Sequence, residues 1–225
     1  GLWWPIRCFI KYGMPLGYVP SLSQNSDMYL GKYSFLERLT GIGSWHLSNM
    51  YPNVGATAAN GAVAGEKFYD YGIAPYIVKT SLFGEYFSLK NVSTTQNFFG
   101  YVLVFSALVL IAISLIGLFM GVRSTLKAND EGGVISKENI IPFIFLVVYY
   151  AFLVGSYVSF CFKYPHTCTM DFRYIVPTLL IGAVWSGLLV NGAQKWVKPV
   201  KAVLVTATVL FSFSSIVFYS ISYIA

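Results

Sequence analysis

Fifteen residues, 163–177, separate two strongly apolar runs and hold most of the side chains in that region that could do chemistry. They are Lys163, Tyr164, His166, Asp171, Arg173 and Tyr174. Ionisable residues at a membrane edge pair, extend toward head groups, or line a polar cavity. Arginine grips phosphate through its planar guanidinium, and a helix start adds backbone N–H donors. This connecting segment, which we call the 163–177 joint, therefore predicts an anion site for a lipid phosphate, with Arg173 as its main ligand.

The other polar residues of the joint are assigned secondary roles. Lys163, His166 and Tyr174 are expected to support Arg173 at the phosphate, and Asp171 to orient Arg173 rather than to act as a base. A simpler interpretation stays open. Asp171 could cap the following helix, since aspartate at an N-cap accepts backbone N–H bonds and complements the helix dipole. Arg173 would then only reach toward lipid head groups.

Other chemical motifs are few. Cys161 and Cys168 lie on either side of His166, but this spacing matches no standard zinc signature, and the third cysteine, Cys8, is distant in sequence. A divalent metal or a redox disulfide is possible but unsupported, and no cofactor is evident. The sequence contains no nucleotide-binding G-x-x-x-x-G-K-[ST] or G-x-G-x-x-G motif and no H-E-x-x-H. No nucleic-acid partner is expected.

The composition places these residues in a membrane protein. Of 225 residues, 56% are hydrophobic and 11% charged, whereas soluble domains carry about 25% charged residues. Four apolar runs approach the length of about 20 residues that a bilayer requires: 98–122, 140–162, 174–192 and 200–225. Because they lack the alternation of a barrel, they are expected to be helices. The predicted fold is an all-α membrane protein with about four transmembrane helices.

The distribution of Lys and Arg predicts the orientation. The joints after the first and third runs, with the start of the fourth, carry six of these residues, whereas three, Lys90, Lys163 and Arg173, flank the runs on the opposite side. Positive charge marks the cytoplasmic side, so residues 1–97 and the 163–173 joint are predicted to face outward together. The expected location is the plasma membrane, with an extracytoplasmic segment, 1–97, of mixed or irregular structure above the membrane segment, 98–225.

Within residues 1–97 the local signals are weak. Residues 3–12, rich in Trp and Tyr, predict one short helix at the membrane interface. Residues 73–86 fit either a half-buried strand or the start of a helix. His46 fits an ordinary surface or satisfied histidine. The chain has no initiator Met and ends within or just after an apolar run, so we expect it to be a piece of a longer protein.

Three stretches carry a resemblance: "GMPLGYVPSL", "DYGIAPYIVKTSLFGEY" and above all "CTMDFRYIVPTL". They resemble the C-terminal half of bacterial membrane glycosyltransferases of the GT-C architecture, related to protein O-mannosyltransferases and the lipid A aminoarabinose transferase. In that family an Arg-Tyr-x-x-Pro element opens a late transmembrane helix, and residues 173–177 have this form. As an arrangement, the resemblance covers most of the chain.

The resemblance implies transfer of a sugar from a polyprenyl-phosphate donor to an acceptor on the extracytoplasmic face. The family's key acid lies in a first outer loop that has no counterpart here, so the catalytic residues stay unknown and a missing N-terminal half is an expected partner. Some relatives use a metal. Acceptor contacts could come from Asp27, Glu66, Asp70 or Glu85. A secondary transporter and an accessory structural subunit are the alternatives.

Overall fold

The structure is a computed structural model that describes residues 3–13, 29–45, 70–84, 93–126, 135, 137–191 and 197–224. The α-helices are α1 (Trp3–Tyr12), α2 (Phe35–Thr40), α4 (Ile73–Phe83), α5 (Thr94–Leu126), α6 (Ile140–Lys163), α7 (Thr178–Val190) and α8 (Val197–Ile224). Short 3-10 helices are η1 (Lys137–Asn139), η2 (Thr167–Met170) and η3 (Phe172–Tyr174). Among the described residues there is no strand, which confirms the predicted all-α class.

Among the described residues three helices, α5, α6 and α8, are long and apolar enough to cross a membrane. They correspond to the predicted runs 98–122, 140–162 and 200–225, each slightly extended. Large apolar side chains on their outer faces are exposed, among them Phe119 (65%), Phe152 (69%) and Ile216 (67%). A water-soluble domain rarely exposes so much contiguous apolar surface. The protein is therefore membrane-embedded.

The third predicted run, 174–192, differs from the structure. Helix α7 begins at Thr178, because Tyr174 still belongs to η3 and Pro177 occupies the N-cap position of α7. With 13 residues, α7 is about 20 Å long, less than the apolar thickness of about 30 Å. The predicted helix start at residue 174 is wrong, and α7 by itself is shorter than a full span.

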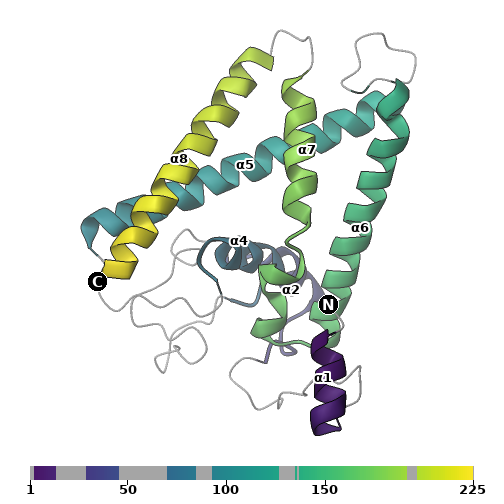
Figure 1. Cartoon of the computed structure of the whole chain (residues 1–225), viewed down its shortest axis with the longest axis vertical. Coiled ribbons are helices and arrows are strands. Elements are labelled where there is room, and N and C mark those ends of the chain that lie inside the picture. Colours follow the sequence, from purple (N-terminus) through teal and green to yellow (C-terminus); the bar gives the residue numbers. More distant parts are fainter. Residues whose placement is uncertain are drawn as a thin grey trace.

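Helix α5 is the element around which the other membrane helices pack. It crosses diagonally behind α7 and α8 (Figure 1) and makes its most extensive contacts with these two helices. Gly117 and Gly121 of α5 make close packing possible, since a Cβ atom at Gly117 would collide with the Trp185 carbonyl and one at Gly121 with the Phe143 ring. Small residues four apart are typical of close helix contacts in membranes.

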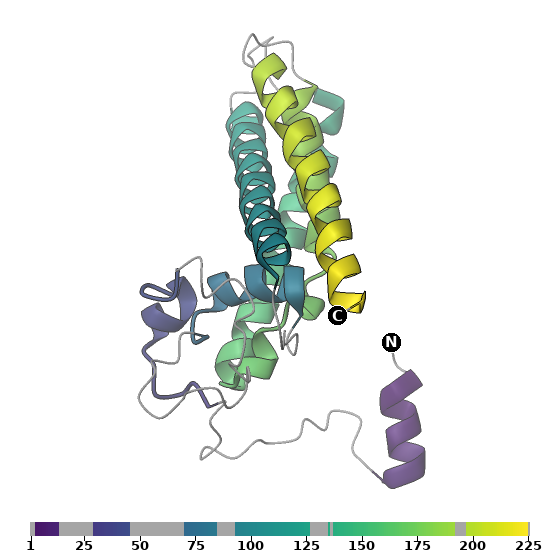
Figure 2. The same ribbon diagram turned by 90° about the vertical axis from the view of Figure 1, so that its left-hand side faces the viewer.

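Helices α2 and α4 form a layer across one end of the bundle (Figure 2). Residues 73–83, for which a strand and a helix start were both open, form the buried helix α4, with Tyr76, Val78 and Phe83 in the core. Residues 3–12 form the predicted helix α1, and its side chains Phe9 and Ile10 are exposed.

Candidate functional site

The 163–177 joint folds back along the end of α6 instead of entering α7 directly. The Tyr157 hydroxyl donates to the Met170 carbonyl at 2.5 Å, and the Cys161 thiol donates to the Thr169 carbonyl at 3.3 Å. Tyr157 and Cys161 are one turn apart on α6, so the two side chains satisfy successive carbonyls of a segment that is not α-helical. Buried backbone needs such partners, and they hold η2 against α6.

The layer formed from residues 29–45 and 70–84 packs directly on this joint. Leu30 donates its backbone N–H to the Pro165 carbonyl at 2.7 Å, and Tyr29 and His166 form an isolated antiparallel bridge. The Phe172 N–H donates to the Thr80 hydroxyl of α4 at 3.0 Å. These contacts place described parts of residues 1–97 against the 163–173 joint, as the sequence predicts.

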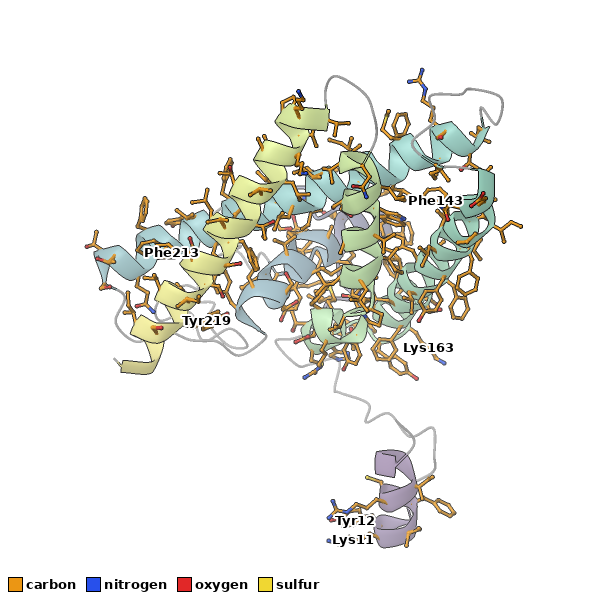
Figure 3. All side chains as sticks on the ribbon, turned by 45° about the horizontal axis from the view of Figure 1, so that its top comes forward. Lys11, Tyr12, Phe143, Lys163, Phe213 and Tyr219 are labelled. Carbon is orange, nitrogen blue, oxygen red and sulfur yellow. The ribbon has the colours of Figure 1, made fainter. Side chains whose placement is uncertain are left out.

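Two exposed cations and three aromatic rings form a surface where α6 ends. The ammonium of Lys163 lies 5.5 Å from the Tyr164 ring, and the guanidinium of Arg173 lies 5.2 Å from the Tyr174 ring. Both tyrosines pack against Phe160, with centroid distances of 5.2 and 5.5 Å. We call these five residues the Phe160 surface. Lys163 marks its position at the end of α6 (Figure 3).

The Phe160 surface is chemically suited to an anion. Lys163, Arg173 and Tyr174 are all exposed, so an incoming ligand can reach their donors. The Arg173 guanidinium contacts the Tyr174 hydroxyl at 3.5 Å, and its planar fork has the geometry that suits a phosphate. Packing of each cation against a ring restricts its position. The structure thus brings together Lys163, Arg173 and Tyr174 of the predicted site.

Asp171 acts on Arg173 through the backbone. Its carboxylate is buried, 6% exposed, and its Oδ1 atom accepts the Arg173 backbone N–H at 2.7 Å. This is an N-cap interaction at η3 and not at α7, the helix that the simpler alternative has Asp171 cap. The cap fixes the turn from which the Arg173 side chain leaves.

His166 lies in a buried layer and not on the Phe160 surface. Its side chain is 7% exposed, and its ring contacts that of Tyr29 edge-on, with centroids 5.5 Å apart. The Nε2 atom has no hydrogen-bond partner within the part of the chain that the structure describes. His166 is therefore not exposed to a phosphate bound at the Phe160 surface. Instead, its side chain connects Tyr29 to the 163–177 joint.

The sequence interpretation missed Arg38, which is 3% exposed. Its Nη2 atom donates to the Cys161 carbonyl in the last turn of α6 at 2.7 Å, and its guanidinium lies 4.6 Å from the Phe162 ring. A cation at a helix C-terminus complements the dipole. Burial lowers the pKa of Arg38 below its ordinary value, and the nearby Cys161 and Tyr29 oppose that shift.

The sequence around Arg38 predicts the helix that carries this residue, but it does not predict that the side chain is buried. Ser34 and Glu37 form a capping box, in which the Ser34 hydroxyl accepts the Glu37 N–H at 3.3 Å and Glu37 accepts the Ser34 N–H at 2.8 Å. The S-x-x-E pattern predicts the start of α2. Which face of so short a helix meets α6 depends on contacts distant in sequence.

The remaining candidate residues do not add to the Phe160 surface. Cys161 and Cys168 form no disulfide, and no group of three or more metal ligands occurs among the described residues. Asp70 pairs with Lys79 at 2.7 Å, so its carboxylate is already in use. The other three predicted acceptor contacts, Asp27, Glu66 and Glu85, lie outside the described residues, as does His46.

Comparisons with protein-family models, with curated proteins and with solved structures find no match to this chain.

Proposed function

We propose that this chain is the donor-binding part of an integral-membrane glycosyltransferase that uses a polyprenyl-phosphate-linked sugar. The observation that carries the proposal is the Phe160 surface, which presents two exposed cations and a tyrosine hydroxyl at one end of a membrane helix. The resemblance of residues 168–179 to the GT-C glycosyltransferases supports the same function.

A lipid phosphate fits this surface because its charged and apolar parts have separate partners. The phosphate would contact Arg173 and Lys163. Large apolar side chains farther along α6 and α7 are exposed, such as Phe152 (69%) and Leu180 (74%), and an isoprenoid tail can lie against them. A soluble anion would gain nothing from these faces, whereas a lipid gains from both.

In the proposed reaction an acceptor hydroxyl attacks the anomeric carbon of the sugar. The bond from that carbon to the lipid phosphate oxygen breaks, and the polyprenyl phosphate leaves with the negative charge. Arg173 and Lys163 would stabilise this developing charge. A general base must take the proton of the acceptor. Asp171 is unsuited to that task because it is buried and caps η3.

The proposed location is the plasma membrane, with the Phe160 surface and the layer of α2 and α4 facing the extracytoplasmic side. The excess of Lys and Arg in the opposite joints supports this orientation. Transport is less well supported, because the described membrane helices carry their Lys and Arg residues at their ends and none in their interiors. Ion-coupled transporters instead place charged groups within spans.

The proposal is tested by donor binding and sugar transfer with the intact protein in detergent. A polyprenyl phosphate should bind at least about tenfold more tightly than the same polyprenol without phosphate. Arg173→Ala should abolish most of this difference and lower transfer, while Arg173→Lys should retain part of it. Lys32→Ala is the matched control for Lys163→Ala, since Lys32 is also exposed and lies over a tyrosine ring, that of Tyr33.

Phosphate-dependent binding that persists unchanged in both Arg173→Ala and Lys163→Ala would refute the assignment of the Phe160 surface as the donor site. Binding without any sugar transfer, in a preparation that contains the whole protein and a range of acceptors, would favour a structural or accessory role.

A further inference from the structure

A groove lies between α5 and α8, away from the Phe160 surface. It has a volume of about 270 Å³ and is lined by Phe105, Ser106, Val109, Ala202, Val203, Thr206, Ala207 and Leu210. The lining is almost wholly apolar, and the Ser106 hydroxyl donates to the Leu103 carbonyl of its own helix at 3.0 Å. Phe105 and Val203 are exposed at 67% and 50%, so the groove opens on the lipid-facing side.

The α8 side of the groove begins one turn after a basic residue. Lys198 precedes Ala202 by four residues, and Ala202 precedes Thr206 by four, so the three side chains lie on successive turns of one side of α8. Lys201 is followed one turn later by Val205, which does not line the groove, so Lys201 lies on another side of α8. Of the two lysines, Lys198 is thus the one in line with the groove residues Ala202 and Thr206.

The start of α8 also lacks the negative charge that a helix N-terminus favours. Its first turn contains no acidic residue but does contain the exposed Lys198. A lysine there faces the positive end of the helix dipole. An anion bound at this point would offset both the lysine charge and the dipole.

We propose that the α5–α8 groove binds one acyl chain of an acidic phospholipid, whose phosphate contacts Lys198. An apolar groove alone would accept any chain, including a neighbouring helix. The basic residue at its head selects a ligand that is negatively charged at one end and apolar along its length, and acidic phospholipids have this form. In Figure 1 α8 begins at the opposite end of the bundle from the end of α6, so this lipid site is separate from the proposed donor site.

Two matched pairs of substitutions test the lipid site by native mass spectrometry of the intact protein in detergent. The probes are phosphatidylglycerol and phosphatidylcholine with identical acyl chains. Val203→Phe fills the groove, and Val205→Phe adds the same ring outside it, at a residue of similar exposure, 53% against 50%. Lys198→Gln removes the charge in line with the groove residues, and Lys201→Gln removes one on another side of α8.

Phosphatidylglycerol is expected to bind about fivefold more tightly than phosphatidylcholine, and Lys198→Gln to remove that preference, because one lysine near an anionic head group contributes about this factor. Lys201→Gln should change the affinity less than about twofold. Val203→Phe should weaken binding of both lipids, and Val205→Phe of neither. Ala202→Leu, a smaller change in the same groove, gives an independent check on Val203→Phe.

Equal affinity for the two lipids, or equal losses from Lys198→Gln and Lys201→Gln, would overturn the role of Lys198. Unaltered lipid binding by both Val203→Phe and Ala202→Leu would overturn the groove as the site. A dimer that dissociates in Val203→Phe with lipid binding unaffected would show that a second copy of the chain occupies the groove instead.

Discussion

Arg38 has a role that its place in the sequence hides. It joins α2 to the end of α6 through the Cys161 carbonyl and the Phe162 ring, directly beside the joint that carries Arg173. The guanidinium is buried, and its Nε atom finds no hydrogen-bond partner among the described residues. Arg38 is therefore a positioning residue that keeps the outer layer on the membrane helices.

Replacing Arg38 by Ala should destabilise the protein. The Cys161 carbonyl loses its charged donor, and such a hydrogen bond contributes about 2 kcal/mol. For a chain of this size that corresponds to a fall in Tm of about 4–8 °C, measured by thermal unfolding in detergent. Lys32→Ala, at an exposed residue of the same segment, should leave Tm nearly unchanged. Equal Tm values for Arg38→Ala and the wild type would contradict the anchoring role.

For single residues, the sequence indicates which polar side chains lie close together better than it indicates which of them are exposed. Lys163, Arg173 and Tyr174 meet as expected, because they lie at two helix ends joined by a short segment. His166, from the same segment, is buried because Tyr29 covers it. Tyr29 is more than a hundred residues away in sequence, and no local pattern reports such a partner.

The bounds of α5, α6 and α8 follow the apolar runs closely, because the length and hydrophobicity of a run determine whether it forms a membrane helix. Helix α7 departs from the prediction for local reasons: the Asp171 cap starts a 3-10 turn, and Pro177 shifts the α-helix to Thr178. Helix α4 was ambiguous from sequence because a short buried run has no clear period. Its tertiary environment, in which Tyr76 and Phe83 are buried, decides in favour of a helix.

The contact between α5 and α7 depends on Gly117. A methyl group there would collide with the Trp185 carbonyl, which belongs to backbone and cannot rotate away. Gly117→Ala should therefore destabilise the protein by about 1–3 kcal/mol. The measurement is Tm in detergent.

Gly155→Ala is the control for Gly117→Ala. Gly155 lies within α6, and a Cβ atom there would meet no atom of the described residues within 4 Å. Alanine favours a helix over glycine by up to about 1 kcal/mol, so this variant should be as stable as the wild type or slightly more so. A Gly117→Ala protein as stable as Gly155→Ala would mean that α5 and α7 are farther apart than described.

As a whole, the molecule has two ends with different surfaces. The end of α6 carries the Phe160 surface and the layer of α2 and α4, and the other end carries the start of α8 with Lys198 (Figure 1). The sequence predicts the membrane class and the contact between the outer segment and the 163–173 joint. It does not predict the groove between α5 and α8, because a groove arises only from the angle at which two helices cross.

The central claim is that the Phe160 surface binds the phosphate end of a polyprenyl phosphate. The most direct test is photo-crosslinking of the intact protein in membranes with an analogue that carries a diazirine in the isoprene unit next to the phosphate, followed by peptide mapping. We predict crosslinks within residues 160–180 that unlabelled polyprenyl phosphate prevents and that Arg173→Ala reduces. Crosslinks confined to residues 197–210, or labelling of residues 160–180 that unlabelled polyprenyl phosphate does not prevent, would contradict the claim.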